Sequence, residues 1–359
     1  MLKPSAQQNA QENAPPNARF SHGGPDALGV PCHDFSTNSN ACGPCPSALA
    51  AVQQADATRY PDPQYHALRE SLAAFHRVSP ARVLLGASAS ELIQRFSAWA
   101  LQAAVPGGGQ VWLPDHHFGD YARAAMALGL QRAADPAQAH LLWCCEPSSP
   151  LGQPQPGLAA LAQGLASQQV AVLDCAYAPL RLSGSPGLSA ELLNQVWQLW
   201  SPNKALGLTG VRAAYVVAPS GQNREMQASV DAVMANLHAR SPSWPVGAHG
   251  AAMLHAWCES ASQDWLRESL GTLRLWKARQ LALCESLGWD CLPSEANYFC
   301  ARIGAPELPS VLTRLRTQGI KLRDAASFGL PRLVRLGVLS PASQEVLSVG
   351  WHQRGKYSG

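Results

Sequence analysis

Val170-Ala-Val-Leu-Asp-Cys-Ala-Tyr177 runs from apolar residues directly into a carboxylate and a phenol. A strand that is buried on both faces is apolar along its length, and in open α/β sheets ligands bind beyond the carboxyl ends of such strands. The stretch therefore predicts a central parallel strand that delivers Asp174 and Tyr177 to a ligand site.

A second segment supplies the charges that such a site needs. In Ser201-Pro-Asn-Lys-Ala-Leu-Gly-Leu-Thr-Gly-Val-Arg212, Lys204 and Arg212 are the charged residues. Alone, Lys204 would be interpreted as a solvated surface lysine. Together with Asp174 and Tyr177, it completes a set that can hold pyridoxal 5′-phosphate. Asp174 would keep the pyridine nitrogen protonated, and Tyr177 would donate to the phenolic oxygen of the ring. Lys204 would form the Schiff base, and Arg212 would balance the phosphate.

A phosphate-binding turn is expected upstream, in Leu84-Leu-Gly-Ala-Ser-Ala-Ser90. A short apolar run ends there in small residues and opens a helical pattern, so N–H groups and hydroxyls at a helix N-terminus can receive a phosphate dianion. The predicted contacts are Gly86, Ala87 and Ser88. An ordinary strand-to-helix turn is the alternative interpretation.

The order of these motifs resembles the fold-type I pyridoxal-phosphate enzymes of aminotransferase class I/II. Within them, it resembles the branch that holds histidinol-phosphate aminotransferase and the threonine-phosphate decarboxylase of cobalamin biosynthesis. The resemblance covers roughly residues 20 to 350 and implies an α/β fold, with a mostly parallel sheet flanked by helices in a large domain plus a smaller α+β domain. The segments Ser21-His-Gly-Gly24 and Asp34-Phe-Ser-Thr-Asn-Ser-Asn40 are similar to the decarboxylase in particular.

The resemblance also implies roles for residues outside the central motifs. Tyr60, in Arg59-Tyr-Pro-Asp62, matches a tyrosine that reaches the cofactor phosphate of the partner subunit, which implies a homodimer. Phe118 aligns with the aromatic residue that stacks on the pyridine ring. Asn297 and Arg335 match a late asparagine and the arginine that clamps the substrate carboxylate bidentately.

A phosphorylated amino acid is the substrate that the resemblance implies. Arg323 matches a position near the distal phosphate of the substrate, and His22 and Asn38 are expected to close that end of the site.

Three positions depart from the family pattern. Ser149, in Glu146-Pro-Ser-Ser-Pro-Leu-Gly152, stands where an asparagine amide usually helps to hold the ring oxygen. Asn203 replaces the serine that usually precedes the lysine, so Ser201 remains as a hydroxyl donor to the phosphate. Cys175 replaces the glutamate that usually follows the aspartate. Because the aspartate, tyrosine, lysine and arginine are retained, the cofactor is still expected to bind.

Length and composition set broad limits. A chain of 359 residues is long enough for one large and one smaller domain. The net charge of +3 is scattered without a basic stripe, which gives no support for nucleic-acid binding. No apolar run approaches a membrane span, and the N-terminus lacks the layout of a secretion signal. A cytoplasmic protein with small anionic ligands is therefore expected.

The chain is expected to divide into four parts. Residues 1–19 are rich in Gln, Asn, Ala and Pro and predict a disordered leader. Residues 20–55 are predicted to pack with the small domain, 56–245 to form the large cofactor-binding domain, and 246–359 to form a linking helix and the small domain. Short apolar runs alternate with helical patterns in the large domain, as in a parallel sheet covered on both faces. The expected strands are 83–85, 110–113, 141–145, 170–173, 196–200 and 213–217, followed in the small domain by 298–303, 319–323 and 333–338.

Ten cysteines raise a hypothesis of another class, because Cys42-Gly-Pro-Cys45 has the spacing of a thiol–disulfide active site. A redox site would place the first cysteine at the start of a helix that follows a strand. The surrounding Asn, Gly and Pro residues instead favour a surface loop near the mouth of the active site. Cys144 and Cys145 are expected to be buried in a strand, and no Cys/His spacing resembles a zinc site.

Three functions stay open at this stage. All reactions of the family start from the same cofactor adduct and differ in which Cα bond stands perpendicular to the ring. The preferred hypothesis is decarboxylation of L-threonine O-3-phosphate to (R)-1-amino-2-propanol O-2-phosphate, because of the segments 21–24 and 34–40. The alternative is transamination of histidinol phosphate or another amino acid, in which Lys204 takes the Cα proton. The changes at Ser149 and Asn203 motivate a third hypothesis, a binding module of the same fold without catalysis.

Overall fold

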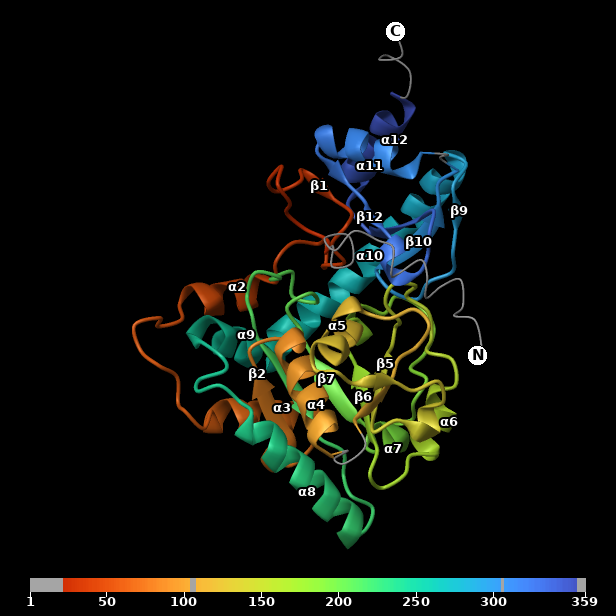
Figure 1. The fold of residues 1–359 in the computed structure, drawn as a ribbon. Helices are drawn as coiled ribbons and strands as arrows, with labels where there is room; N and C mark the ends of the chain where they lie inside the picture. The colour runs from red at the N-terminus through yellow and green to blue at the C-terminus, as the bar shows by residue number, and fades with distance from the viewer. Residues whose placement is uncertain (1–21, 104–107, 305–306, 354–359) are drawn as a thin grey trace, which may run out of the picture.

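The computed structural model describes residues 22–103, 108–304 and 307–353. The leader predicted at residues 1–19 lies outside the described residues. Two sheets with their own helices lie at opposite ends of the molecule, and a long helix connects them (Figure 1). The predicted domain boundaries after residues 55 and 245 stay predictions.

The larger sheet has seven strands in the order β2-β8-β7-β6-β5-β3-β4. Its strands are β2 (Val83–Gly86), β3 (Gln110–Trp112), β4 (Gln131–Arg132), β5 (Leu141–Cys145), β6 (Val170–Asp174), β7 (Trp197–Trp200) and β8 (Ala214–Val217). The strands from β4 to β7 are parallel, whereas β8 runs antiparallel to both of its neighbours. The prediction of a mostly parallel sheet is confirmed, and every residue of β5 and β6 is buried, including Cys144 and Cys145.

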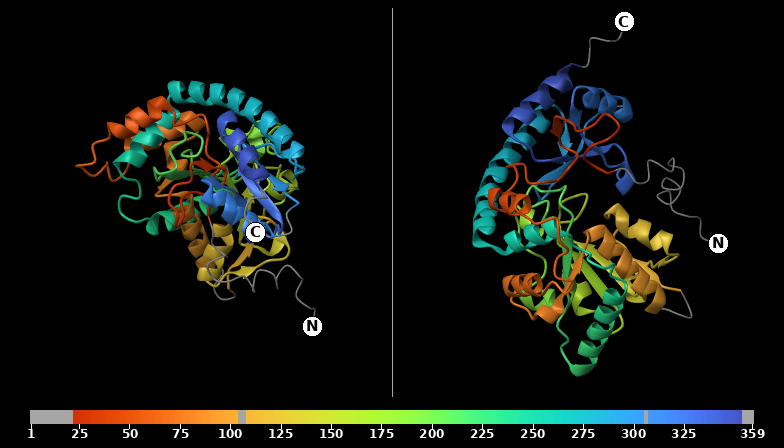
Figure 2. Two further views of the ribbon diagram at one scale, coloured as in Figure 1. Left: turned by 90° about the horizontal axis from the view of Figure 1, so that it is seen from above. Right: turned by 90° about the vertical axis from the view of Figure 1, so that its left-hand side faces the viewer.

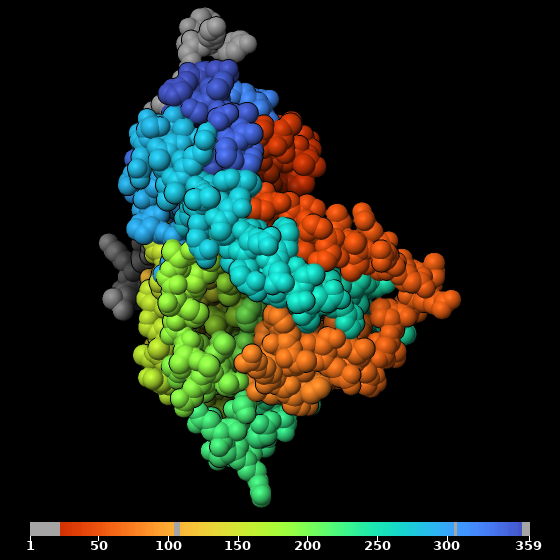
Figure 3. Space-filling model, turned by 180° about the vertical axis from the view of Figure 1, so that it is seen from behind, coloured from red at the N-terminus to blue at the C-terminus, as the bar shows by residue number. Residues whose placement is uncertain are grey.

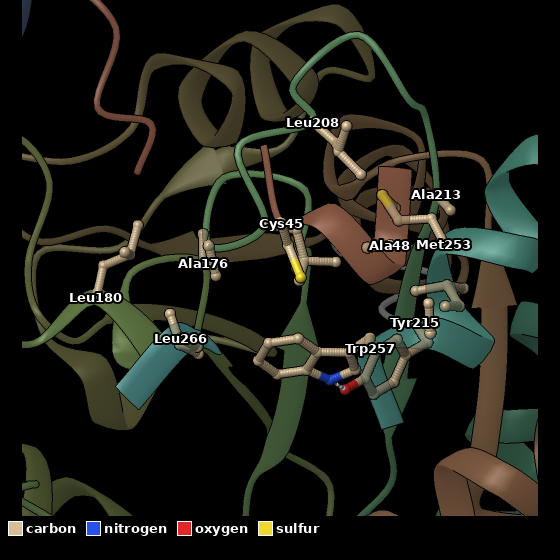
Figure 4. Packing of buried hydrophobic residues seen from close by; sticks show 14 of the residues in the cluster. Cys45, Ala48, Ala176, Leu180, Leu208, Ala213, Tyr215, Met253, Trp257 and Leu266 are labelled. Atoms are coloured by element: carbon tan, nitrogen blue, oxygen red, sulfur yellow. Dashed lines mark hydrogen bonds between the residues drawn. The ribbon is translucent and has the colours of Figure 1, made fainter. Parts of the chain in front are cut away.

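Helices cover both faces of this sheet because successive strand residues point to opposite sides. On one face, Leu84 packs with α4 (Ala89–Ala103), α5 (Gly119–Ala127) and α8 (Arg224–Ala239). On the other face, Val83 and Leu85 pack with α2 (Pro46–Gln53), α3 (His66–His76) and α9 (Ala248–Cys258). Tyr215 and Trp257 lie together in this second layer, joined by a hydrogen bond (Figure 4). The short helices α6 (Leu158–Gln163) and α7 (Ala190–Leu193) complete the layer beside β5 and β6.

Two helices stand where one linking helix was predicted at the start of residues 246–359. Helix α9 ends at Cys258, and Glu259 is extended before α10 (Ser260–Ser286) begins. With 27 residues, α10 is about 40 Å long. It runs along the side of the molecule from the larger sheet to the C-terminal part of the chain (Figures 2 and 3).

The smaller sheet is antiparallel and has the order β12-β13-β10-β9. Its strands are β9 (Asp290–Cys291), β10 (Tyr298–Arg302), β12 (Arg323–Asp324) and β13 (Leu333–Gly337). Helices α11 (Leu308–Thr317) and α12 (Pro341–His352) pack on it together with the end of α10.

Residues 22–40, which we call the N-terminal strap, join this part of the fold. Within the strap, β1 (His33–Asp34) pairs in parallel with β11 (Ile320–Lys321), and Phe35 is fully buried in the core of the smaller sheet. The prediction of one strand over 319–323 is wrong. The segment changes partner at Leu322, because β11 pairs with the strap whereas β12 pairs with β13.

None of the helices in the described ranges combines the length and the apolar character that crossing a membrane requires.

Candidate active site

A cavity of about 650 Å³ lies between the two sheets, beyond the carboxyl end of β6. Its wall combines the N-terminal strap, the first turns of α4 and α5, the loop after β7, and β12 and β13. The structure brings most of the predicted site residues to this wall, namely His22, Asn38, Ser88, Phe118, Ser149, Asp174, Tyr177, Ser201, Lys204, Arg212, Arg323 and Arg335.

Lys204 lies in the loop between β7 and β8, which is held by its own backbone. The N–H of Leu206 donates to Pro202 at 2.9 Å, and that of Leu208 donates to Asn203 at 2.8 Å. Gly207 has a φ of 68°, and a Cβ there would lie 2.5 Å from the carbonyl oxygen of Gly43. Glycine is thus required where the loop meets the segment that contains the two spaced cysteines.

That segment is not the predicted surface loop. Cys45 is fully buried, because it precedes α2 and packs against α10, where its thiol lies 3.6 Å from the Ser262 hydroxyl. Cys42 is half-buried, and its thiol donates to the Ser269 carbonyl at 3.6 Å. Both thiols are free.

Asp174 ends β6 with both carboxylate oxygens hydrogen-bonded. Oδ1 accepts from the N–H of Ala176 at 2.9 Å, and Oδ2 accepts from the hydroxyl of Tyr121 at 2.6 Å. Burial raises the pKa of Asp174, and the hydrogen bond from Tyr121 is the largest of the opposing effects. The neighbouring Cys145 and Cys175 thiols are buried as well, and burial raises the pKa of each.

Tyr121 is a site residue that sequence reasoning missed. It is fully buried and stacks on Trp143, with ring centroids 4.5 Å apart and an interplanar angle of 6°. Its spacing was the available signal, because Tyr121 follows Phe118 by three residues, and residues three apart share one face of a helix.

Tyr177 lies between Lys204 and the N-terminal strap. The ammonium of Lys204 is 5.5 Å from the centre of its ring, and the amide Nδ2 of Asn38 donates to its hydroxyl at 3.3 Å. Asn38 lines the cavity together with His22 and Arg323, and its role at the distal phosphate end stays a prediction. The strap places Asn38 beside Tyr177 because Asn297 binds the backbone carbonyls of residues 38 and 39.

Asn297 itself is not brought to the cavity wall. Its side chain is fully buried, and Nδ2 donates to the carbonyls of Asn38 and Ser39 at 3.3 and 3.1 Å. Predicted to contact the substrate, Asn297 instead holds the strap that carries Asn38.

Arg323 and Arg335 face each other across β12 and β13 as direct cross-strand partners. Both are buried, with 6% and 7% of their surface exposed, and both lie over the ring of Phe328. Arg335 donates to the Ser36 carbonyl at 3.2 Å, and Arg323 donates to the Ser327 hydroxyl at 2.8 Å. Burial, followed by the charge of Arg335, lowers the pKa of Arg323 to about 10. Like charges placed opposite each other are unfavourable, so the pair fits anionic groups in the cavity.

The predicted phosphate turn is only partly built as expected. The N–H of Ala87 donates to the Glu91 carboxylate at 3.2 Å, and a Cβ on Gly86 would lie 2.5 Å from Leu92. Because helix α4 uses these two positions for its own contacts, Gly86 and Ala87 do not line the cavity. Ser88 does line it, although its hydroxyl already accepts from the N–H of Glu91 at 3.1 Å.

Two further donors come from the segment between β7 and β8, one a hydroxyl and the other a guanidinium. The hydroxyl of Ser201 is buried and has no hydrogen-bond partner among the described residues. Arg212 is exposed to solvent and lines the cavity. Asn203 points its Nδ2 back to the carbonyls of Thr209 and Val211 at 3.4 Å, so it fixes the lysine loop.

The mouth of the cavity contains a carboxylate that the sequence did not reveal. Asp120 is buried at the start of α5 and accepts from the Ser90 hydroxyl at 2.5 Å. His22 of the strap places Nε2 3.9 Å from Asp120 and its ring 6.3 Å from that of Phe118. The strap thus contacts the larger sheet's helices at the cavity entrance.

Tyr60 lies away from the cavity of its own chain. Its side chain is 77% exposed and stacks on the ring of Trp244 with centroids 4.3 Å apart. The role across a subunit interface stays a prediction.

Comparison with known families identifies this arrangement. The profile of the aminotransferase class I and II family matches residues 30–134 and 127–348. The chain belongs to this family.

Relatives in the family share most of the chain at low identity. Histidinol-phosphate aminotransferases from Ruegeria pomeroyi and Jannaschia sp. are 29% and 26% identical and cover 85% and 86% of this chain and 86% and 87% of their own. The structure of the Sinorhizobium meliloti histidinol-phosphate aminotransferase with pyridoxal-5′-phosphate has a TM-score of 0.77 at 22% identity, covering 96% of each chain. The L-threonine-O-3-phosphate decarboxylase from Porphyromonas gingivalis has a TM-score of 0.71 at 18% identity, covering 89% of this chain and 98% of its own.

As in other class I and II aminotransferases, the cofactor is pyridoxal 5′-phosphate, and the cavity contains groups that fit it. The buried carboxylate of Asp174 lines the cavity and would pair with a protonated pyridine nitrogen. The unpaired hydroxyl of Ser201 and the cation of Arg212 suit the phosphate. We propose that these residues, with Lys204, Asp174, Tyr177, Ser88 and Phe118, hold the cofactor.

Proposed function

We propose that the protein exchanges an amino group between a phosphorylated amino compound and a keto acid, with histidinol phosphate as the first substrate to test. The buried arginine pair Arg323 and Arg335 carries this proposal, because it offers two planar cationic forks on one wall of the cavity that Lys204 enters. Curated relatives with 26% and 29% identity over most of the chain bear the name histidinol-phosphate aminotransferase, which supports the same choice.

The residues divide the work by position. When bound, the cofactor supplies an electron sink that makes the Cα–H bond of the substrate acidic. Lys204 would take the proton from Cα, since it is the basic group beside Tyr177. Arg335 and Arg323 orient the substrate by its anionic groups, a phosphate in one half-reaction and two carboxylates of the keto-acid partner in the other.

The test is amino transfer by the cofactor-loaded protein from histidinol phosphate to 2-oxoglutarate. Formation of glutamate that depends on both compounds supports the proposal. The matched control is Lys204→Ala, which removes the proposed base. No transfer to any of several keto acids would argue against transamination.

A second candidate has its own observation. His22 of the His-Gly-Gly opening lines the cavity, and this opening is the segment that resembles the decarboxylase. In decarboxylation of L-threonine O-3-phosphate, the arginines would hold the Cα–carboxylate bond perpendicular to the ring, and Lys204 would protonate Cα after CO₂ has left. Release of CO₂ and aminopropanol phosphate without any keto acid would select this reaction over transamination.

We also propose that the protein acts as a homodimer. Tyr60 and Trp244 form an exposed aromatic pair, and Tyr60 matches the residue that reaches a partner's phosphate site in the family. Mass measurement in solution tests the dimer. A catalytically complete monomer would remove any role for Tyr60 across subunits.

A further inference from the structure

The hydroxyl of Tyr177 has a single proton, and its direction decides what the residue can do in the cavity. The amide Nδ2 of Asn38 donates to this hydroxyl at 3.3 Å, so the tyrosine oxygen is an acceptor on that side. No group among the described residues is bonded as an acceptor from Tyr177. The proton of Tyr177 is thereby left to point into the cavity, toward a bound molecule.

The position of Asn38 is fixed by contacts with the lysine loop itself. Two residues further on, the N–H of Asn40 donates to the carbonyl of Lys204 at 2.9 Å, and its side chain donates to that of Ala205 at 3.1 Å. On the other side, Asn297 donates to the Asn38 carbonyl at 3.3 Å. The amide of Asn38 is therefore held relative to Lys204 by the backbone on both sides, and only 2% of the residue is exposed.

The loop after β5 lacks the amide that the family usually has there. Ser149 stands at the family's asparagine position, and its hydroxyl accepts from Nη1 of Arg335 at 3.5 Å. A serine side chain is shorter than an asparagine and can donate one hydrogen bond where an amide can donate two. Among the described residues, the side-chain amide that is hydrogen-bonded to Tyr177 is that of Asn38, which comes from the strap.

We propose that Asn38 replaces the missing asparagine as a positioning residue, acting through Tyr177. By donating to the hydroxyl oxygen, Asn38 directs the tyrosine proton at the phenolic oxygen of the bound cofactor. The amide oxygen Oδ1 of Asn38 is buried without a hydrogen-bond partner among the described residues, which leaves a second, accepting contact for the bound molecule. The inference depends on cofactor binding and not on which reaction follows.

The pH dependence of the visible absorption of the loaded protein tests this. A hydrogen bond to the ring oxygen stabilises its negative charge most when the neighbouring lysine nitrogen has lost its proton. Removing the donor therefore raises the pH midpoint of the absorption change. For Asn38→Ala we expect a rise of about half to one pH unit and a roughly five- to tenfold weaker cofactor affinity, the size of one hydrogen bond.

The sign of the shift decides between two orientations of the amide. If Asn38 instead accepted the tyrosine proton, its removal would release that proton to the ring, and the midpoint would fall. A midpoint that falls or stays unchanged in Asn38→Ala overturns the proposal. The matched control is Asn236→Ala on α8, the same truncation at a residue that does not line the cavity, for which the midpoint and the cofactor affinity should equal those of the unmodified protein.

A rescue variant tests whether Asn38 takes over the role of the asparagine that is missing at position 149. Adding Ser149→Asn to Asn38→Ala returns an amide to the family position, and the midpoint should move back by more than half of the shift. If Ser149→Asn leaves the midpoint of Asn38→Ala unchanged or raises it further, the exchange of roles between the two positions is refuted. Should the double variant not fold, as judged by its thermal unfolding without cofactor, the sign of the shift in Asn38→Ala decides alone.

Discussion

Replacing Tyr121 with phenylalanine removes one hydrogen bond from the most buried carboxylate of the cavity. The lost contact is the 2.6 Å bond from the hydroxyl to Oδ2 of Asp174, which leaves that carboxylate one partner, the N–H of Ala176. The aromatic ring and its stack on Trp143 are retained, so the packing changes little. Hydrogen bonds to charged groups contribute about 1.5–3 kcal/mol, which corresponds to a rise of about one to two units in the pKa of Asp174.

The sign of the effect on the cofactor follows from that rise. Burial already raises the pKa of Asp174, and the Tyr121 bond opposes it. With a higher pKa, Asp174 holds a proton in the cofactor-free protein, and this neutral form offers no opposite charge to a protonated pyridine nitrogen. We expect the dissociation constant of pyridoxal 5′-phosphate to rise about 10- to 100-fold in Tyr121→Phe, measured by titrating the visible absorption.

The matched control is Tyr215→Phe. Tyr215 is also fully buried, but its hydroxyl is bonded to His76 at 2.8 Å and to Trp257 at 3.1 Å and not to Asp174. Its loss should lower the thermal stability while the cofactor affinity stays constant. Equal cofactor affinities in Tyr121→Phe and the unmodified protein, or equal losses in both variants, would refute the reasoning.

Three further predictions concern other residues. Borohydride should fix the cofactor on the peptide containing Lys204 and leave Lys204→Ala unlabelled; a colourless, unlabelled natural protein would favour a binding module without catalysis. Arg335→Lys keeps the charge but loses the fork that faces Arg323, so the KM for the phosphorylated substrate should rise about tenfold with little change in kcat, and an unchanged KM would place the substrate elsewhere. Burial lowers the pKa of His76 from 6.5 to about 4, so the unfolded chain binds the proton first and the free energy of unfolding falls as the pH drops through this range. Between pH 6.5 and 5 the free energy of unfolding should fall by about 1.6 kcal/mol in the unmodified protein and not in His76→Gln, as measured by urea unfolding; parallel losses in both proteins would contradict the assignment.

The strands of the larger sheet could be predicted because each is a short apolar run with a polar end. Val170–Asp174 and Leu141–Cys145 are buried on both faces, and such strands differ clearly from their surroundings in sequence. The prediction of one strand over 319–323 was wrong because the sequence pattern does not show the pairing partners. The residues of this segment fit one strand, but strand pairing depends on partners that are distant in sequence, and here the partner changes at Leu322.

Which residues belong to the site could be predicted more readily than where their side chains point. A motif identifies Asn38 and Asn297 as residues of the site, but which of them faces the cavity depends on the path of the strap. The role of Tyr121 was accessible from its spacing to Phe118, whereas the pairing of Asp120 with Ser90 joins two helix starts that no local pattern connects. Cys45 shows the same limit, because its burial depends on α10.

The parallel pairing of β1 with β11 joins a segment that is synthesised early to one that is synthesised late. His33 leaves the ribosome long before Ile320, its partner in the ladder, has been made. Until then the strap has no strand to pair with, and the Asn40 contact with the carbonyl of Lys204 lacks its anchor on that side. Contacts between residues so distant in sequence form slowly. We therefore expect a nascent chain to acquire its affinity for the cofactor late, and a chain stopped before β11 to complete its larger sheet without gaining a working site.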